Sequence, residues 1–218
     1  MLVIISVIAI VAFAVLGLVF AVMKATVIST ISVKSIRVSE ENGTVLLVEV
    51  DGSMWAPPVA VTLYENGRQV ASSSVDVPGV AKLRLTDSKH SITGSRNYTL
   101  HLHIPYLFDR DTEVHIKGAV PEIKCVDRVV VLGSKEPLLK SILLNISNNG
   151  DAPLYICTDC SPQINVYVNG ESATVVNIAP TTAIMPGESR VVEVELMPIP
   201  DKPANITIAI GPRIVCGY

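Results

Sequence analysis

The chain has 218 residues and a formal net charge of −3, so neither nucleic acid nor an acidic surface is indicated as a partner. Charged residues make up 17% of the chain, below the roughly 25% of an average globular protein, and hydrophobic residues make up 49%. This length accommodates one apolar helix and one or two domains of about 100 residues each.

The chain begins with an apolar segment that has no charge before Lys24 and has Ser6 as its only polar residue. Roughly 20 apolar residues in a helix cross the hydrocarbon core of a bilayer, and residues 2–23 supply that length. A cleaved secretory signal is disfavoured, because such signals carry a basic segment ahead of an apolar stretch of about 7 to 15 residues. A plain membrane anchor fits the length, but the nearest basic residues follow the helix, which is a poor orientation signal for an anchor with its domain outside. We therefore predict a hydrophobic helix over residues 1–25, acting either as a membrane span or as the core of a filament.

Small side chains in the second half of this helix predict close contact with other helices. Ala14, Gly17 and Ala21 are spaced by three and then four residues, which places them along one stripe. Ala9 and Ala12 fall on other faces. The stripe predicts a helix-packing surface.

After the helix, short runs of alternating apolar and polar residues predict β-strands separated by turns. Asn-Gly pairs supply the positive φ angles that tight hairpin turns need. These pairs are Asn42-Gly43, Asn66-Gly67, Asn149-Gly150 and Asn169-Gly170. Strands are expected within 30–53, 59–77, 81–87, 97–106, 113–120, 127–133, 138–156, 164–176, 188–199 and 204–215.

The number and spacing of these strands predict a mainly β chain, with two immunoglobulin-like antiparallel β-sandwiches following the helix. We place the first sandwich at 26–118 and the second at 119–218, with the boundary near Gly118 to Pro121. The alternating pattern implies one solvated face per sheet, as antiparallel sheets allow.

An uncharged apolar N-terminal helix that leads directly into Val-, Ile- and Thr-rich strands resembles the subunits of archaeal type IV pili and archaella. The stretches "LLNISNNGDAPLYI", "VYVNGESATV" and "IMPGESRVVEVEL" are similar to the β-modules of such pilins. The resemblance implies a helix that is membrane-inserted before assembly and then packs with its copies along the filament axis, with the β-domains outside. A short basic leader removed ahead of Met1 would account for the missing basic residues. The β region departs from the family pattern in size, since many such pilins have one β-domain.

The four cysteines lie in the second half of the chain, and their even number favours disulfides in an exported protein. Cys157 and Cys160 form a Cys-x-x-Cys pair, but a redox site would place this pair at a helix N-terminus, and no helix is expected there. A zinc site would want a second ligand pair, whereas Cys125 and Cys216 stand singly. Of the three possible pairings we favour Cys125–Cys216, since the first and last strands of a sandwich can be neighbours. Cys157–Cys160 then closes a small loop.

Four Asn-x-Ser/Thr triplets follow the hydrophobic segment, and together they favour an exported glycoprotein. Such short triplets also occur by chance. The candidate glycosylation sites are Asn42, Asn97, Asn145 and Asn205.

Three histidines are candidates for a metal site. His101 and His103 are two residues apart, so they share one face of a strand, and His115 could join them. We favour the simpler interpretation, in which they line the solvent-facing side of a strand.

Three carboxylates, Asp109, Asp111 and Glu113, alternate along the next stretch and could bind Ca²⁺. The stretch lacks the glycine and the distal bidentate glutamate of an EF-hand loop, so we favour a solvated turn.

No Gly-x-Ser-x-Gly, phosphate-binding loop or His-Glu-x-x-His motif is present, so we predict no enzyme, no catalytic residue and no cofactor or metal. The preferred hypothesis is a structural subunit of a cell-surface filament, with copies of itself as its partner. The alternative is a single-span, membrane-anchored ectodomain that acts as a binding or accessory module.

Overall fold

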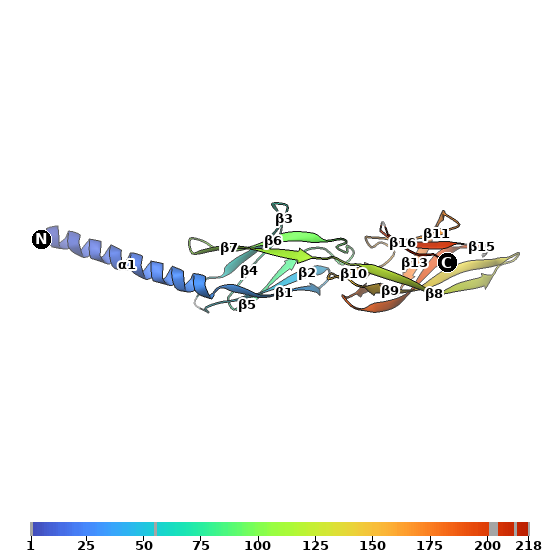
Figure 1. Ribbon diagram of the computed structural model, residues 1–218, viewed down its shortest axis with the longest axis horizontal. Coiled ribbons are helices and arrows are strands. Elements are labelled where there is room, and N and C mark those ends of the chain that lie inside the picture. The colour runs from blue at the N-terminus through green and yellow to red at the C-terminus, as the bar shows by residue number, and fades with distance from the viewer. Residues whose placement is uncertain (1, 55, 201–204, 212, 218) are drawn as a thin grey trace. The chain divides into compact units, whose positions relative to one another are not determined.

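The computed structural model describes residues 2–54, 56–200, 205–211 and 213–217. Side chains are described for 11–27, 29–54, 56–200 and 205–211. Within these residues the chain is mainly β, which confirms that part of the fold prediction, and it has one helix, α1 (Leu2–Thr30). Figure 1 follows the chain from α1 in blue to the last strands in red.

The strands before residue 117 are β1 (Ser32–Glu40), β2 (Thr44–Asp51), β3 (Val59–Glu65), β4 (Arg68–Val75), β5 (Gly79–Arg84), β6 (Arg96–Ile104) and β7 (Phe108–Ile116). The strands after residue 120 are β8 (Pro121–Leu132), β9 (Pro137–Asn148), β10 (Leu154–Ile156), β11 (Ile164–Val168), β12 (Glu171–Ala173), β13 (Val175–Ala179), β14 (Thr182–Ile184), β15 (Ser189–Pro200), β16 (Ile206–Ile210) and β17 (Arg213–Gly217).

Helix α1 ends at Thr30, beyond the predicted end at residue 25. The polar residues of its last turns direct their hydroxyl groups to the helix's own carbonyl oxygens. The hydroxyl of Thr26 donates to Val22 at 2.9 Å, that of Ser29 to Thr26 at 2.8 Å, and that of Thr30 to Val27 at 3.1 Å. Val27 is buried at this end of the helix.

In the part of the chain with described side chains, no helix is long and apolar enough to cross a membrane. The predicted membrane insertion of residues 1–25 finds no support there and stays a prediction.

The chain divides into two compact units, each made of several segments. Unit 1 consists of Met1–Arg37, Leu47–Leu83 and Tyr98–Val114, and unit 2 of Val38–Leu46, Arg84–Asn97 and His115–Tyr218. Strands β1 to β7 form two sheets, with strand orders β1-β2-β5 and β4-β3-β6-β7. Strands β8 to β17 form three others. The domain limits 26–118 and 119–218 stay a prediction, since segments on both sides of residue 118 contribute to unit 2.

In strands β3 and β6 of unit 1, alternate side chains are buried, as the period-two pattern predicts. In β3 these are Val59, Val61 and Leu63, and in β6 they include Leu100 and Leu102. β3 pairs antiparallel with β4 on one side and with β6 on the other. The residues between the buried ones, His101 among them, therefore lie on the opposite face of this sheet.

In unit 2, two four-stranded sheets, β13-β15-β9-β8 and β12-β11-β16-β17, enclose a common hydrophobic core. Leu144 and Val194 come from the first sheet, and Val166 and Ile208 from the second. The short pair β10-β14 adds Leu154 and Ile184 to the same core.

Three of the four predicted Asn-Gly turns have the expected backbone. Asn42, Asn66 and Asn169 have φ angles of 52°, 51° and 53°, and the glycine after each also has a positive φ. The pair Asn149-Gly150 differs, since neither residue is among the described residues with positive φ. Gly150 is required for another reason, because a Cβ there would lie 1.8 Å from the carbonyl oxygen of Gly118.

The buried side chain of Asn148 holds this region together. Its Oδ1 accepts hydrogen bonds from the backbone N–H of Val120 at 3.1 Å and of Gly150 at 3.0 Å. Its Nδ2 donates to the carbonyl oxygens of Ala152 at 2.7 Å and of Ile184 at 3.0 Å. The side chain thereby ties the end of β9 to the chain before β8 and to β14.

Candidate functional site

Helix α1 exposes a continuous apolar surface. Every described side chain from Val11 to Thr26 is exposed, including Phe13 at 77% and Leu18 at 67%. Lys24 is the single charged residue of the helix, and it is exposed too. A helix that is apolar on all sides is normally buried, and large exposed apolar surfaces are typical of interaction sites.

The predicted stripe Ala14, Gly17 and Ala21 lies within this exposed surface. Around Gly17 the chain leaves open space, since an added Cβ would meet no atom within 4 Å. A larger side chain at this position would therefore project outward without disturbing its own chain.

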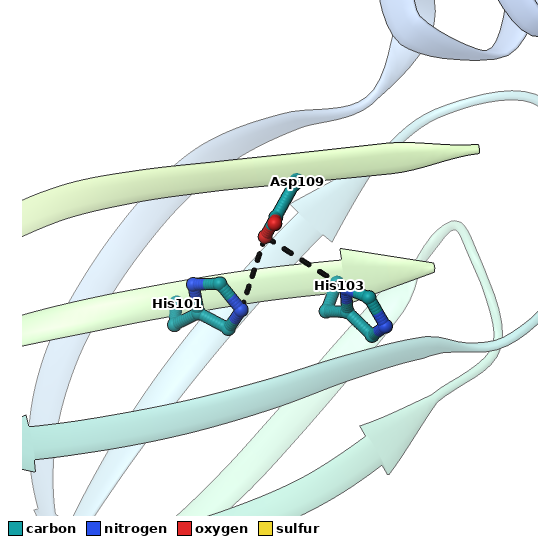
Figure 2. A group of neighbouring side chains, drawn as sticks. All are labelled: His101, His103 and Asp109. Carbon is teal, nitrogen blue, oxygen red and sulfur yellow. Dashed lines mark ion pairs between the residues drawn. The ribbon is translucent and has the colours of Figure 1, made fainter. Parts of the chain in front are cut away.

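The hairpin of β6 and β7 brings histidines and carboxylates together, and Figure 2 shows three of these side chains, His101, His103 and Asp109. His101 Nε2 lies 3.0 Å from Asp109 Oδ1, and His103 Nδ1 lies 3.7 Å from the same oxygen. The other ring nitrogen of His101, Nδ1, lies 2.7 Å from Asp111 Oδ1. We call His101, His103, Asp109 and Asp111 the hairpin cluster.

The two imidazole rings of the hairpin cluster are ordered by ring contacts. The rings of His101 and His103 stack with centroids 5.9 Å apart and planes 14° apart. The ring of Tyr64 on β3 meets His101 edge-on, with centroids 6.2 Å apart. The His101 side chain is 28% exposed and that of His103 is 43% exposed. Both imidazole rings therefore contact the protein on one side and solvent on the other.

The structure decides against one histidine alternative and corrects the placement of the carboxylates. His115 does not join His101 and His103, because its Nδ1 lies 2.6 Å from Asn97 Oδ1 at another place on the sheet. Asp109, Asp111 and Glu113 belong to strand β7, not to a turn. Among the described residues, the side chains whose potential metal-binding atoms lie within 4.8 Å of one another are His101, His103 and Asp109, and Glu113 is not one of them.

The sequence contained a signal for the hairpin cluster that the predictions missed. The alternating pairs His101/His103 and Asp109/Asp111 flank a connection of three residues, 105–107. Two strands joined by so short a connection pair as a hairpin, so side chains of one face come together across it.

The cysteines agree with the prediction where they are described. Cys157 and Cys160 form a disulfide with an S–S distance of 1.99 Å. Cys125 on β8 is disulfide-bonded as well. The side chain of Cys216 is outside the described residues, but its strand β17 contacts β8. The pairing Cys125–Cys216 stays a prediction.

The loop closed by Cys157 and Cys160 is joined to the segment 87–91 within unit 2. The N–H of Ser161 donates to the carbonyl of Lys89, and the N–H of Ser91 donates to the carbonyl of Ser161, both at 2.7 Å. Lys89 also pairs with Asp159, and this contact lowers the pKa of the Asp159 carboxyl and raises that of the Lys89 ammonium group. Both side chains are exposed, so the pair contributes little to stability.

Three of the predicted glycosylation sites are accessible. Asn42, Asn97 and Asn205 are exposed, with Asn42 in a hairpin turn and Asn205 directly before β16. Asn145 lies within the inner strand β9 and is half-buried. Glycosylation at all four stays a prediction.

No family model matches the chain, and no curated protein matches it significantly. A solved structure described as the crystal structure of YadV chaperone aligns with 87% of this chain and 100% of its own. The sequence identity is 16% and the TM-score is 0.24, so this similarity carries no argument about function.

Proposed function

We propose that the chain is a structural subunit of an extracellular filament of the archaeal type IV pilus kind. Helix α1 packs with its copies in the filament core, and two immunoglobulin-like β-sandwiches lie outside. The observation that supports this proposal is the exposed apolar surface of α1. At about 25 cal/mol per Å² of apolar area, leaving the described apolar side chains from Val11 to Ala25 in water costs on the order of ten kcal/mol or more.

Copies of the same chain are the proposed cover, with the membrane in that role before assembly. Ala14, Gly17 and Ala21 allow helix backbones to approach closely. The exposed sequons at Asn42, Asn97 and Asn205 fit a glycosylated outer layer on the cell surface. Neither a catalytic role nor nucleic-acid binding belongs to the proposal.

The alternative is a membrane-anchored ectodomain that acts as a binding or accessory module. Here lipid is the permanent cover of α1, and the chain does not polymerise. The same exposed helix surface is compatible with this alternative, so the two functions differ in what covers the helix.

Mechanical shearing of cells distinguishes the two functions. A filament subunit is covered mainly by its copies, so shearing without detergent should release long polymers that sediment and contain this chain by mass spectrometry. An anchored ectodomain should remain with the membrane fraction and dissolve only in detergent. Recovery solely as detergent-solubilised monomers or small complexes would reject the filament.

The same assay tests the packing role of the helix stripe. Gly17→Leu adds bulk where the isolated chain has open space, and leucine favours helix over glycine by about 0.8 kcal/mol, so the helix itself should remain intact. We expect this variant to lose sheared filaments while its β-strand circular dichroism is retained. Ala12→Leu makes a similar change off the stripe and should assemble better than Gly17→Leu. Normal filaments from Gly17→Leu would contradict the packing role.

A further inference from the structure

We propose that the hairpin cluster binds a divalent transition-metal ion of the Zn²⁺ class, with His101, His103 and Asp109 as ligands. This site goes beyond the proposed filament function. The ligand atoms of His101, His103 and Asp109 all lie within 4.8 Å of one another.

The two distances from Asp109 to the histidines are close to the ligand–ligand distances around a tetrahedral ion. Zn²⁺ binds imidazole nitrogen and carboxylate oxygen at about 2.0 to 2.2 Å, which places neighbouring ligand atoms about 3.4 Å apart in a tetrahedron. The separations from Asp109 Oδ1 are 3.0 Å to His101 Nε2 and 3.7 Å to His103 Nδ1, one slightly shorter and one slightly longer than that value.

The donor set favours a transition metal over Ca²⁺ or Mg²⁺. Imidazole nitrogens suit Zn²⁺, Cu²⁺ and Ni²⁺, whereas Ca²⁺ takes six to eight oxygen ligands and Mg²⁺ is also bound through oxygen. Two of the three proposed ligands are imidazoles, and the carboxylate that converges on them supplies one oxygen.

Asp111 provides a second, independent observation. Histidines that bind a metal through one ring nitrogen usually donate their other N–H to a carboxylate, which fixes the ring and its tautomer. His101 has this arrangement, with Nε2 toward Asp109 and Nδ1 at 2.7 Å from Asp111. Asp111 is therefore a positioning residue for the ligand His101.

The cluster leaves a fourth coordination position open. His103 and Asp109 also line a cavity of about 590 Å³ at the end of the hairpin, together with Tyr106 and Phe108. Water or an external ligand can reach the ion from this side, as in zinc sites with three protein ligands.

Zinc titration of the full-length chain in detergent, after removal of metals with a chelator, tests the proposal by isothermal calorimetry. We expect one Zn²⁺ per chain. Asp109→Asn replaces an exposed ligand with a side chain of the same shape, so it should weaken binding without unfolding the hairpin. The loss of Zn²⁺ affinity in Asp109→Asn, and also in His103→Ala, should be larger than the roughly 10- to 100-fold loss of affinity expected for the positioning variant Asp111→Asn.

His90→Ala is the matched control, because His90 is another exposed histidine paired with a carboxylate, Asp87, outside the cluster. It should bind Zn²⁺ like the wild type. Co²⁺ in place of Zn²⁺ should give the intense visible absorption of a tetrahedral site in the wild type and in His90→Ala, but not in His103→Ala. Absence of Zn²⁺ binding, or equal binding by wild type, Asp109→Asn and His103→Ala, would overturn the proposal and leave ordinary ion pairs between strands.

Discussion

Asn148 uses its whole hydrogen-bonding capacity inside unit 2, since an amide side chain offers two acceptor positions and two donors. Asn148→Ala would leave the four backbone groups that it binds without this partner. A buried polar group left unpaired costs about 1 to 3 kcal/mol, and local relaxation relieves part of the total. We expect the free energy of unfolding to fall by about 3 kcal/mol or more, measured by thermal unfolding in detergent with circular dichroism.

Asn149→Ala is the control for this prediction. The side chain of Asn149 is exposed, and its Nδ2 donates to Glu122 Oε2 at 2.9 Å on the surface. Its removal should cost less than about 1 kcal/mol. Similar losses for the two variants would show that the buried network does not stabilise this region.

Tyr155 gives the chain a sensitivity to alkaline pH. Its ring is buried, and its hydroxyl and that of Thr44 are buried without a hydrogen-bond partner of normal geometry among the described atoms. Burial raises the pKa of Tyr155, and the nearby Thr44 hydroxyl offsets this in part. The folded chain therefore holds the phenolic proton more tightly than the unfolded chain, in which tyrosine ionises near pH 10. This contribution to stability is complete below about pH 10 and is lost as the pH rises through the folded pKa.

We therefore expect the melting temperature of the wild type to fall more than that of Tyr155→Phe between about pH 8 and about pH 11. The pairs Lys34–Glu49 and Lys89–Asp159 also lose their charge attraction at high pH, but they do so equally in both proteins. Equal falls in melting temperature would contradict the role of Tyr155.

The secondary-structure features that could be predicted are those that depend only on residues close together in the sequence. The turns at Asn42, Asn66 and Asn169 follow from the left-handed conformations that Asn-Gly favours, and the sequence is enough to find them. Gly150 has a different cause, its close approach to Gly118, and this depends on a neighbour 32 positions away. The end of α1 was missed because the hydroxyls of Thr26, Ser29 and Thr30 bond within the helix, where their residue types alone favour a helix end.

The candidate site follows the same division between local and distant causes. Side chains alternate between the two faces of a β-strand, so the spacing of His101 and His103 is enough to predict that they lie on one face. Their carboxylate partners follow from the three-residue connection that pairs β6 with β7, a local signal that the predictions did not use. His115 shows the limit of the face argument, because it is directed to Asn97 instead.

Strands β8 and β17 are the element pair that the predicted bridge Cys125–Cys216 would join. In the chain-entropy treatment, a bridge around a loop of about 90 residues restricts the unfolded chain by roughly 4 to 5 kcal/mol, against roughly 2 kcal/mol for the small Cys157–Cys160 loop. The double variant Cys125→Ala/Cys216→Ala should therefore lower the free energy of unfolding about twice as much as Cys157→Ala/Cys160→Ala. Peptide mapping under non-reducing conditions checks the connectivity, and a peptide joining Cys125 to Cys157 or Cys160 would refute it.

At the scale of the whole molecule, the segmented composition of the two units has no signature in the sequence. The segments Val38–Leu46 and Arg84–Asn97 belong to unit 2 although both precede residue 118. The hydrogen bonds that join segment 87–91 to the loop at residues 157–161 are between backbone groups, which every residue type carries. Sequence patterns therefore predict strands and turns, but they do not predict with which of the two units a connecting segment packs.

The lone charge of α1 limits the axial stagger between neighbouring subunits in the proposed filament. At about 1.5 Å per residue, the apolar stretch before Lys24 is about 33 Å long, and about 9 Å of helix follows it. The helix contains no acidic residue, so a neighbour that slides over Lys24 would enclose an ammonium group without a counter-charge. The permitted offsets are those that keep each Lys24 in reach of water or of a carboxylate on a β-domain. One lysine thus narrows the set of helical arrangements that the apolar surface of α1 would otherwise allow.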